Sequence, residues 1–321
     1  DATIQKFEYS GYMYRDIDIK GNIKDNLFSG QLDIEDQYID LNLNGDVNFS
    51  DINHPSFDAN LVVEKADLEG LNLTDYPMNM EFKFSGDVDS FDIYNFRGDA
   101  LVRDLKITKM DTIEMTMDSL EVISSTSGSQ NVLQIKSELL NGEIIGDYSL
   151  FNSVSAIKNL FARSYPAFAE QLNIQNDTAS YNAQLDLELK LHNSANFEKL
   201  ISPDLSTIKD LKIESYIDSK NDTIYFSAFA PDIEYQNNQL LNSYIFLESI
   251  GNQGNLVLSV DSTIIGNTRL KPISVFSDIV KDTIQYNVNV SDFDKVADNL
   301  NISGKLFTKD SLLVTSILNT D

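Results

Sequence analysis

Residues 39–49 read IDLNLNGDVNF, and apolar and polar side chains alternate along them without a break. Ile39, Leu41, Leu43, Val47 and Phe49 share one parity, whereas the opposite parity holds only Asp and Asn. Because successive side chains of a strand point to opposite faces, this segment predicts a strand with one apolar and one polar face.

The same alternation recurs along the chain and predicts a sheet with one continuous apolar face. It is found in Ile17–Ile23, Phe28–Ile34, Phe57–Val63, Met78–Val88, Ile113–Met117 and Tyr181–Leu191, and further strands are expected at Ile213–Ile217, Thr223–Ala228, Tyr244–Glu248, Leu256–Val260 and Ile284–Val290. Short polar links such as residues 24–26 favour antiparallel neighbours, since parallel crossovers are longer. We therefore predict a mainly β fold: an elongated, curled, predominantly antiparallel sheet, taco-like, with an open groove.

One segment changes period and predicts a central amphipathic helix at Ser153–Leu172, capped by Ser153 and kinked or ended near Pro166. A plug over the apolar sheet is the favoured interpretation, and a membrane or partner helix is the alternative. The chain then divides into a β-groove segment at 1–150, a helical plug or linker at 151–175 and a second β-groove segment at 176–321. Short helical connectors are expected at Ser194–Leu200, with Phe197, Leu200 and Ile201 facing inward, and at Asp292–Leu300.

Composition limits the classes of function. The chain has 321 residues, of which 42% are hydrophobic, and 50 Asp and Glu against 24 Lys and Arg give a formal charge of −26. A charge of this sign repels phosphate backbones, so no nucleic-acid partner is expected. Cysteine is absent, which excludes disulfides and thiolate zinc sites. No apolar run approaches the roughly 18 residues of a membrane-spanning helix.

The sequence offers little for catalysis. His54 and His192, the only histidines, fall in separate predicted turns. There is no Gly-rich phosphate loop, no HExxH helix and no nucleophile elbow. No enzymatic activity, metal or cofactor is therefore expected.

Two recurring features each leave two interpretations open. Gly21, Gly30, Gly45 and Gly86 lie on the apolar parity, which indicates either a sharp curl of the sheet or extra room for a ligand tail. Triplets of Asp, Ser or Thr, and a small or aliphatic residue resemble the O-glycosylation signal of exported proteins in some Gram-negative bacteria, or else mark turns that precede strands. They begin at Asp111, Asp118, Asp177, Asp222, Asp261, Asp282 and Asp310.

Three stretches carry a family resemblance. Residues 137–150 (SELLNGEIIGDYSL), followed by the helix through Tyr165 and Pro166, resemble the repeat region of TamB-like proteins in the AsmA-like and repeating β-groove superfamily. Residues 17–48 and residues 65–73 (KADLEGLNL) are similar to the same family. The resemblance covers most of the chain, but it rests on strand and turn patterns rather than on a catalytic signature.

The resemblance implies a periplasmic bridge protein whose apolar groove carries phospholipid acyl chains between the inner and outer membranes. It also implies a role in outer-membrane protein assembly with a barrel partner of the Omp85 type, reached through regions outside this segment. The inner-membrane anchor would likewise lie in a segment absent here. The side chains expected to contact acyl chains are Ile17, Ile19, Phe28, Leu32, Ile34, Leu41, Leu43, Val47, Phe49, Phe57, Leu61, Phe82, Phe84, Leu185, Leu187 and Leu189.

Other classes of protein also fit alternating strands. The main alternative is an extracellular or cell-surface structural or adhesive β protein that buries the same face in a sandwich. An outer-membrane barrel needs aromatic girdles, and this chain has no Trp. Lipid that co-purifies with the chain would distinguish the groove from the sandwich.

Overall fold

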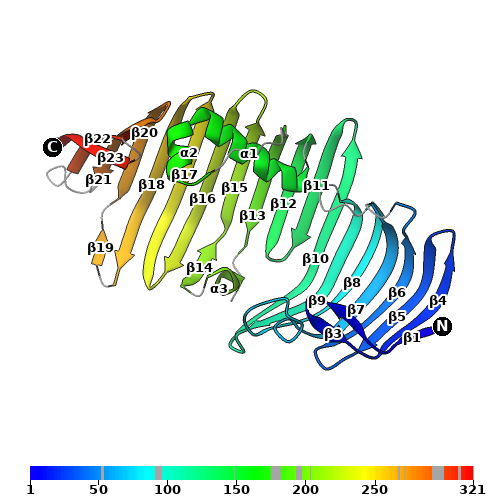
Figure 1. Ribbon diagram of the computed structural model, residues 1–321. Helices are drawn as coiled ribbons and strands as arrows, with labels where there is room; N and C mark the ends of the chain where they lie inside the picture. The colour runs from blue at the N-terminus through cyan, green and yellow to red at the C-terminus, as the bar shows by residue number, and fades with distance from the viewer. Residues whose placement is uncertain are drawn as a thin grey trace. The chain divides into compact units, whose positions relative to one another are not determined.

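A computed structural model describes residues 1–51, 54–90, 96–147, 149–174, 182–192, 197–202, 204–266, 268–270, 272–290, 300–309 and 312–320. Most of these residues belong to one antiparallel sheet of 21 strands, and only three helices, all short, accompany it (Figure 1). The expectation of a mainly β, antiparallel fold is therefore confirmed. The predicted connector at Asp292–Leu300 lies almost entirely outside the described residues.

The described chain divides into two compact units. The first comprises residues 1–127, 132–141 and 194–203, and the second comprises residues 128–131, 142–193 and 204–321. The division of the chain at 150 and 176, drawn from the sequence, stays a prediction.

The first unit holds the N-terminal run of strands and one short helix. Its elements are β1 (Ala2–Ile4), β2 (Phe7–Tyr9), β3 (Tyr12–Tyr14), β4 (Ile17–Lys24), β5 (Leu27–Glu35), β6 (Ile39–Asn48), β7 (Ser56–Asp67), β8 (Met78–Ser90), β9 (Arg97–Lys109), β10 (Ile113–Ser127), most of β11 (Gln130–Ser137) and α3 (Phe197–Ile201). Strands β4 to β10 pair with their sequence neighbours, as short turns require, and β2 and β3 form a separate hairpin.

The second unit holds the other two helices and the C-terminal strands. Its elements are most of β12 (Leu140–Asp147), α1 (Leu150–Ser164), α2 (Pro166–Gln171), β13 (Gln184–Leu191), β14 (Leu205–Lys209), β15 (Leu211–Asp218), β16 (Thr223–Tyr235), β17 (Asn238–Ile250), β18 (Gln253–Ile265), β19 (Thr268–Leu270), β20 (Ile273–Val280), β21 (Thr283–Val290), β22 (Leu300–Lys309) and β23 (Leu312–Thr320). Strands β13 and β15 to β18 pair in order, and β20 to β23 continue the series.

The predicted central helix exists, but it starts earlier and is divided in two. Ser149 is the N-cap, and Ser153, which was expected to cap, lies inside the first turn, where its N–H and Oγ both donate to Ser149 O at 2.8 Å. The assignment of Ser153 as the cap was therefore wrong. The break at Pro166 is confirmed: Tyr165 leaves the helical conformation and Pro166 opens α2, because the residue before proline is disfavoured in a helix while proline suits the first helical position.

Candidate functional site: an apolar face of the sheet

In the first unit, the strand register aligns the apolar parity of each strand into rows that cross the sheet. One row joins Ile19, Leu32, Leu43, Leu61 and Phe84 through directly paired positions on β4 to β8. The adjacent row begins with Ile17, Ile34 and Leu41 and continues on β7 and β8. Both rows belong to the same face, since their members differ by two residues along each strand.

A third row in this unit consists of small residues. Directly paired positions place Gly21, Gly30, Gly45, Ala59, Gly86 and Ala100 in one line across β4 to β9. A Cβ atom on Gly30 would lie 2.2 Å from Lys20 O, and one on Gly86 would lie 2.6 Å from Cζ of Phe84. The glycines thus permit close approach of neighbouring strands, and the Phe84 ring occupies the space above Gly86. These contacts favour the curl over extra room for a ligand.

Helix α3 covers part of this face in the first unit. Its Phe197 and Leu200 pack against Met115, Met117 and Leu139, and Lys109 Nζ donates to Leu200 O at 2.8 Å at the end of the helix. The inward orientation expected for Phe197 and Leu200 is confirmed. Ile201, however, is 63% exposed, so its expected inward orientation was wrong. Ile201 is the last residue of this five-residue helix, and the residue of α3 that is fully buried is Glu198.

The second unit also carries apolar rows across its strands. One row is entirely aliphatic over the eight strands β13, β15 to β18 and β20 to β22; it consists of Leu189, Ile213, Ala228, Ile245, Leu258, Val275, Val288 and Ile302. With strands about 4.8 Å apart, seven intervals extend roughly 34 Å. None of these eight side chains is fully buried, and Ile245 is 41% exposed. We call this set the aliphatic row.

Helices α1 and α2 lie on the same face of the sheet (Figure 1). They contact residues two to four positions further along the strands than the aliphatic row, such as Leu247 and Ile279. Tyr165 and Phe168 pack against Ile279, together with Leu247 and Leu256. Sheet residues near the helices are buried, among them Leu185 (7%), Ile217 (7%) and Ser249 (0%). The favoured interpretation of this segment, a helix that covers the apolar sheet, is therefore confirmed within the second unit.

Polar contacts at hairpin turns attach the helix pair to the sheet. The guanidinium of Arg163 donates to Ser219 O and to Asp222 Oδ1, both at 2.7 Å. Asp282 Oδ1 accepts hydrogen bonds from the backbone N–H of Ala167 at 2.8 Å and of Phe168 at 3.3 Å, which satisfies the first turn of α2. The helices are thus fixed at two separate hairpins as well as by their apolar contacts.

The expected acyl-chain residues fall into two groups. Thirteen belong to the first unit, and Leu185, Leu187 and Leu189 belong to the second. Within the first unit, the register confirms a common face for the twelve of them that lie in strands. Phe49 lies just after β6, donates its N–H to Asn26 O and is 41% exposed, so it is not a strand residue. Leu185 is buried, which leaves it little surface for a ligand.

Sequence reasoning missed most of the aliphatic row: six of the eight strands that carry it were expected, whereas β20 and β22 were not. Its members on β15 to β18 stand in runs such as Tyr244–Leu247, in which both parities are apolar. Such runs do not show which face is covered. The signal that could have been used is that the other parity of these strands is also apolar. This second apolar parity places aromatic rings on the face of the unit opposite to the aliphatic row.

The remaining motifs have structural contacts of their own. Asp222 and Asp282 hold the helix pair, and Ser262, in the triplet from Asp261, is 3% exposed and accepts a hydrogen bond from Arg269. Asp177, Asp310 and Ser311 lie outside the described residues. Glycosylation of the triplets stays a prediction. His54 lies 2.8 Å from Asp51 in one unit, and His192 lies 3.6 Å from Asp210 in the other.

Comparisons with known proteins found no match: no family model, no curated protein and no solved structure is similar to this chain. The TamB-like resemblance therefore stays a prediction. Within the described residues, no helix has the length and hydropathy needed to cross a membrane.

Proposed function

We propose that this chain binds lipid acyl chains on its apolar face and passes them along it, as the TamB-like resemblance implies. The observation that carries the proposal is the aliphatic row, which crosses eight strands without a polar residue and remains partly exposed. Soluble proteins rarely expose contiguous apolar surface of this kind unless it contacts a ligand, a partner or a membrane.

The contrast between the aliphatic row and the row beneath α1 and α2, which lies four residues further along the strands, supports a lipid as the occupant. The row beneath α1 and α2 is interrupted by Ser249 and Gly254, and half of its eight members are buried. The aliphatic row, by comparison, offers only methyl and methylene groups. Each buried methylene of a tail would contribute about 0.8 kcal/mol. Because apolar contact is non-directional, a tail could move from strand to strand without losing a specific bond.

The periplasmic bridge between two membranes and the Omp85-type partner belong to the proposal through the resemblance alone. The structural or adhesive alternative has one observation in its favour, since α1 and α2 already cover part of the apolar face as a second layer would. The two functions differ in what touches the aliphatic row: acyl chains in one case, and polypeptide in the other.

Photo-crosslinking tests the proposal directly. Benzoylphenylalanine at Leu258 would lie in the aliphatic row, whereas the same group at Ser259 would lie on the opposite face of the same strand. The chain would be expressed with membranes present, irradiated, purified without detergent and analysed by mass spectrometry. Phospholipid adducts at position 258 but not at 259 are expected. Equal labelling at both positions, or adducts with protein alone at 258, would refute lipid binding and favour the structural function.

A further inference from the structure

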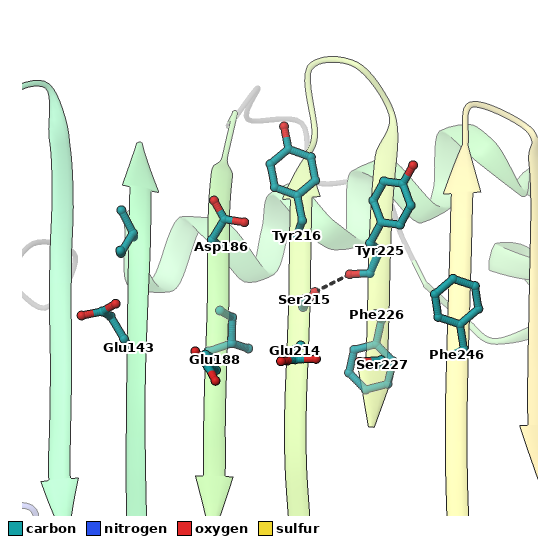
Figure 2. A pocket seen from close by; sticks show the side chains of 12 residues that line it. Glu143, Asp186, Glu188, Glu214, Ser215, Tyr216, Tyr225, Phe226, Ser227 and Phe246 are labelled. Atoms are coloured by element: carbon teal, nitrogen blue, oxygen red, sulfur yellow. Dashed lines mark hydrogen bonds between the residues drawn. The ribbon is translucent and has the colours of Figure 1, made fainter. Parts of the chain in front are cut away.

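The face of the second unit opposite to α1 and α2 carries exposed aromatic rings. Figure 2 shows strands side by side with the helices behind them, and Tyr216, Tyr225 and Phe246 project from the near side. Tyr225 is 37% exposed, and Phe276, further along the same face, is 54% exposed. We call these four side chains the aromatic stripe. Alternating strands alone would predict a polar surface here.

The stripe lies along a series of shallow depressions. The first, of about 440 Å³, is lined by Tyr216, Tyr225 and Phe246 together with acidic side chains of β12, β13 and β15. Two more, of about 520 and 400 Å³, follow on β17, β18, β20 and β21, and they share Asn255 and Asp278. The depressions thus succeed one another across the strands, which suits an extended ligand rather than a compact one.

The rings are arranged for contact through their faces. Tyr216 and Tyr225 are directly paired on β15 and β16, with ring centroids 6.4 Å apart and planes inclined by 47°. In Figure 2 the rings of Tyr216 and Phe246 turn their faces away from the sheet. Aromatic faces that are open to solvent provide large, rigid contact area for another flat, partly apolar ring.

The polar groups around the rings are mostly engaged with one another. Tyr225 donates its hydroxyl hydrogen to Glu248 at 3.0 Å. Lys212 Nζ donates a hydrogen bond to Glu214 and lies 3.9 Å from Glu188 Oε1. The hydrogen bond from Lys212 lowers the pKa of the Glu214 carboxyl. These carboxylates retain lone pairs that can accept hydrogen bonds from hydroxyl groups. An anionic ligand would meet several carboxylates and is disfavoured.

We propose that the aromatic stripe binds a linear, non-anionic glycan. Sugar rings stack on aromatic faces through their C–H groups, their hydroxyls donate to carboxylates and exchange hydrogen bonds with amides such as Asn255, and their polymers are extended. A cationic peptide fits less well, because Lys212 and Tyr225 already engage three of the carboxylates. This site is separate from the apolar face, which lies on the other side of the same strands.

Titration calorimetry with the whole chain tests the proposal. The probes are hexamers of β-1,4-linked N-acetylglucosamine and of β-1,4-linked glucose, an oligogalacturonate as the anionic control and an oligolysine peptide as the cationic one. We expect binding of at least one neutral hexamer and none of the oligogalacturonate. The double variant Tyr216→Ala/Tyr225→Ala should lose at least tenfold in affinity. Tyr225→Phe, which keeps the ring, should lose less than threefold.

The matched control is Ile245→Ala, an exposed residue on the opposite face of β17, which should leave glycan affinity unchanged. Circular dichroism would establish that each variant is folded, and Phe276→Ala, in a more exposed position, replaces the double variant if that one is not. The proposal is overturned if neither neutral hexamer binds, if only oligolysine binds, or if the folded ring variants bind as well as the unmodified chain.

Discussion

The hydroxyl groups of Tyr165 and Ser249 lie 2.6 Å apart, and both side chains are buried where the break between α1 and α2 meets the sheet. Burial raises the pKa of Tyr165 despite the opposing effect of this hydrogen bond. This pair joins the helices to a residue within β17, next to its last residue, whereas the hydrogen bonds of Arg163 and Asp282 are made at hairpin turns. It therefore fixes the position of the helices over the apolar face.

Removing one partner of this pair should cost more than removing both. Tyr165→Phe leaves the Ser249 hydroxyl buried without its phenol partner, and we expect a loss of about 1–3 kcal/mol in unfolding free energy. The double variant Tyr165→Phe/Ser249→Ala removes both hydroxyls and should recover part of that loss. Urea unfolding of the single and double variants measures the coupling. Strictly additive effects would show that the hydrogen bond does not stabilise the helix pair.

Asp282 should stabilise α2 from the β20–β21 turn. Replacing it with alanine removes the acceptor for the N–H groups of Ala167 and Phe168, which should cost about 0.5–2 kcal/mol. Asp278→Ala, on the exposed face of β20, changes the net charge equally and is the control. Hydrogen exchange should show faster exchange in residues 166–171 for the first variant alone. Similar exchange in both variants would contradict a capping role.

The row of glycines predicts that neighbouring strands approach one another too closely for a side chain at these positions. A Cβ on Gly45 would lie 2.3 Å from Asp58 O, and Gly45 has a φ of +156°. Gly45→Ala should therefore cost more than about 3 kcal/mol. Gly128→Ala is the control: φ is +65° but no atom lies within 4 Å of its Cβ, so only the cost of the conformation, about 1 kcal/mol, is expected. Thermal unfolding compares the two, and equal costs would refute close strand approach at Gly45.

The contact between the β2–β3 hairpin and Asp36 should be lost at both extremes of pH. Burial, and then the hydrogen bond to Asp36, raise the pKa of Tyr12 to about 12 from 10.0. The stabilisation that the neutral Tyr12 hydroxyl provides through its contact with Asp36 is therefore complete below pH 10 and is lost as pH rises towards 12. Burial of Asp36 acts to raise its pKa, but hydrogen bonds from Tyr12 and from backbone N–H groups outweigh this effect and lower it below 3.8. The stabilisation that the ionised Asp36 carboxylate provides is therefore present above pH 3.8 and is lost as pH falls further.

Hydrogen exchange of residues 7–14 as a function of pH measures this contact, with each rate corrected for the intrinsic dependence of exchange on pH. Protection should be greatest between the two limits. Tyr12→Phe, which lacks the hydroxyl, should abolish the alkaline decrease. An alkaline decrease that persists in this variant would assign the effect to another group.

The sequence sufficed for the class of fold because alternation and short turns are local. Residues 39–48 form a strand as predicted, and Pro166 divides the helix as its missing N–H requires. The cap was misplaced because Ser149 and Ser153 are both serines, and only the first has an extended backbone before the helix.

The candidate site was only partly predictable, because it depends on pairing between strands. Whether Leu189 and Ile213 stand side by side is decided by register, which is set by turns and bulges rather than by either strand alone. The same limit applies to α3, whose Phe197 packs against strands that precede it by some 80 residues. Strands that are apolar on both parities, as in residues 244–247, give no sign of which face is covered.

The structure also changes the control for the lipid hypothesis. An acidic residue at Leu43, in the middle of an apolar row, should block passage of acyl chains, because its charge must be desolvated or must draw water into the path. Asn42→Asp looks like a natural control on the opposite face, but Asn42 donates to Asp33, and a second carboxylate there would repel the first. Asn44 is exposed on that same face and is paired with Gln31 and Asn60, so Asn44→Asp is the better choice.

Transfer of a fluorescent phospholipid between donor and acceptor vesicles, with the purified chain in solution, compares the two variants. Leu43→Asp should reduce the transfer rate at least tenfold, and Asn44→Asp should change it less than twofold. Both variants must retain the circular dichroism of the unmodified chain, because a charge that unfolds the sheet would also stop transfer. Folded Leu43→Asp that transfers lipid as fast as Asn44→Asp would show that lipid does not pass over this row, and the structural function would then be the better account of the apolar face.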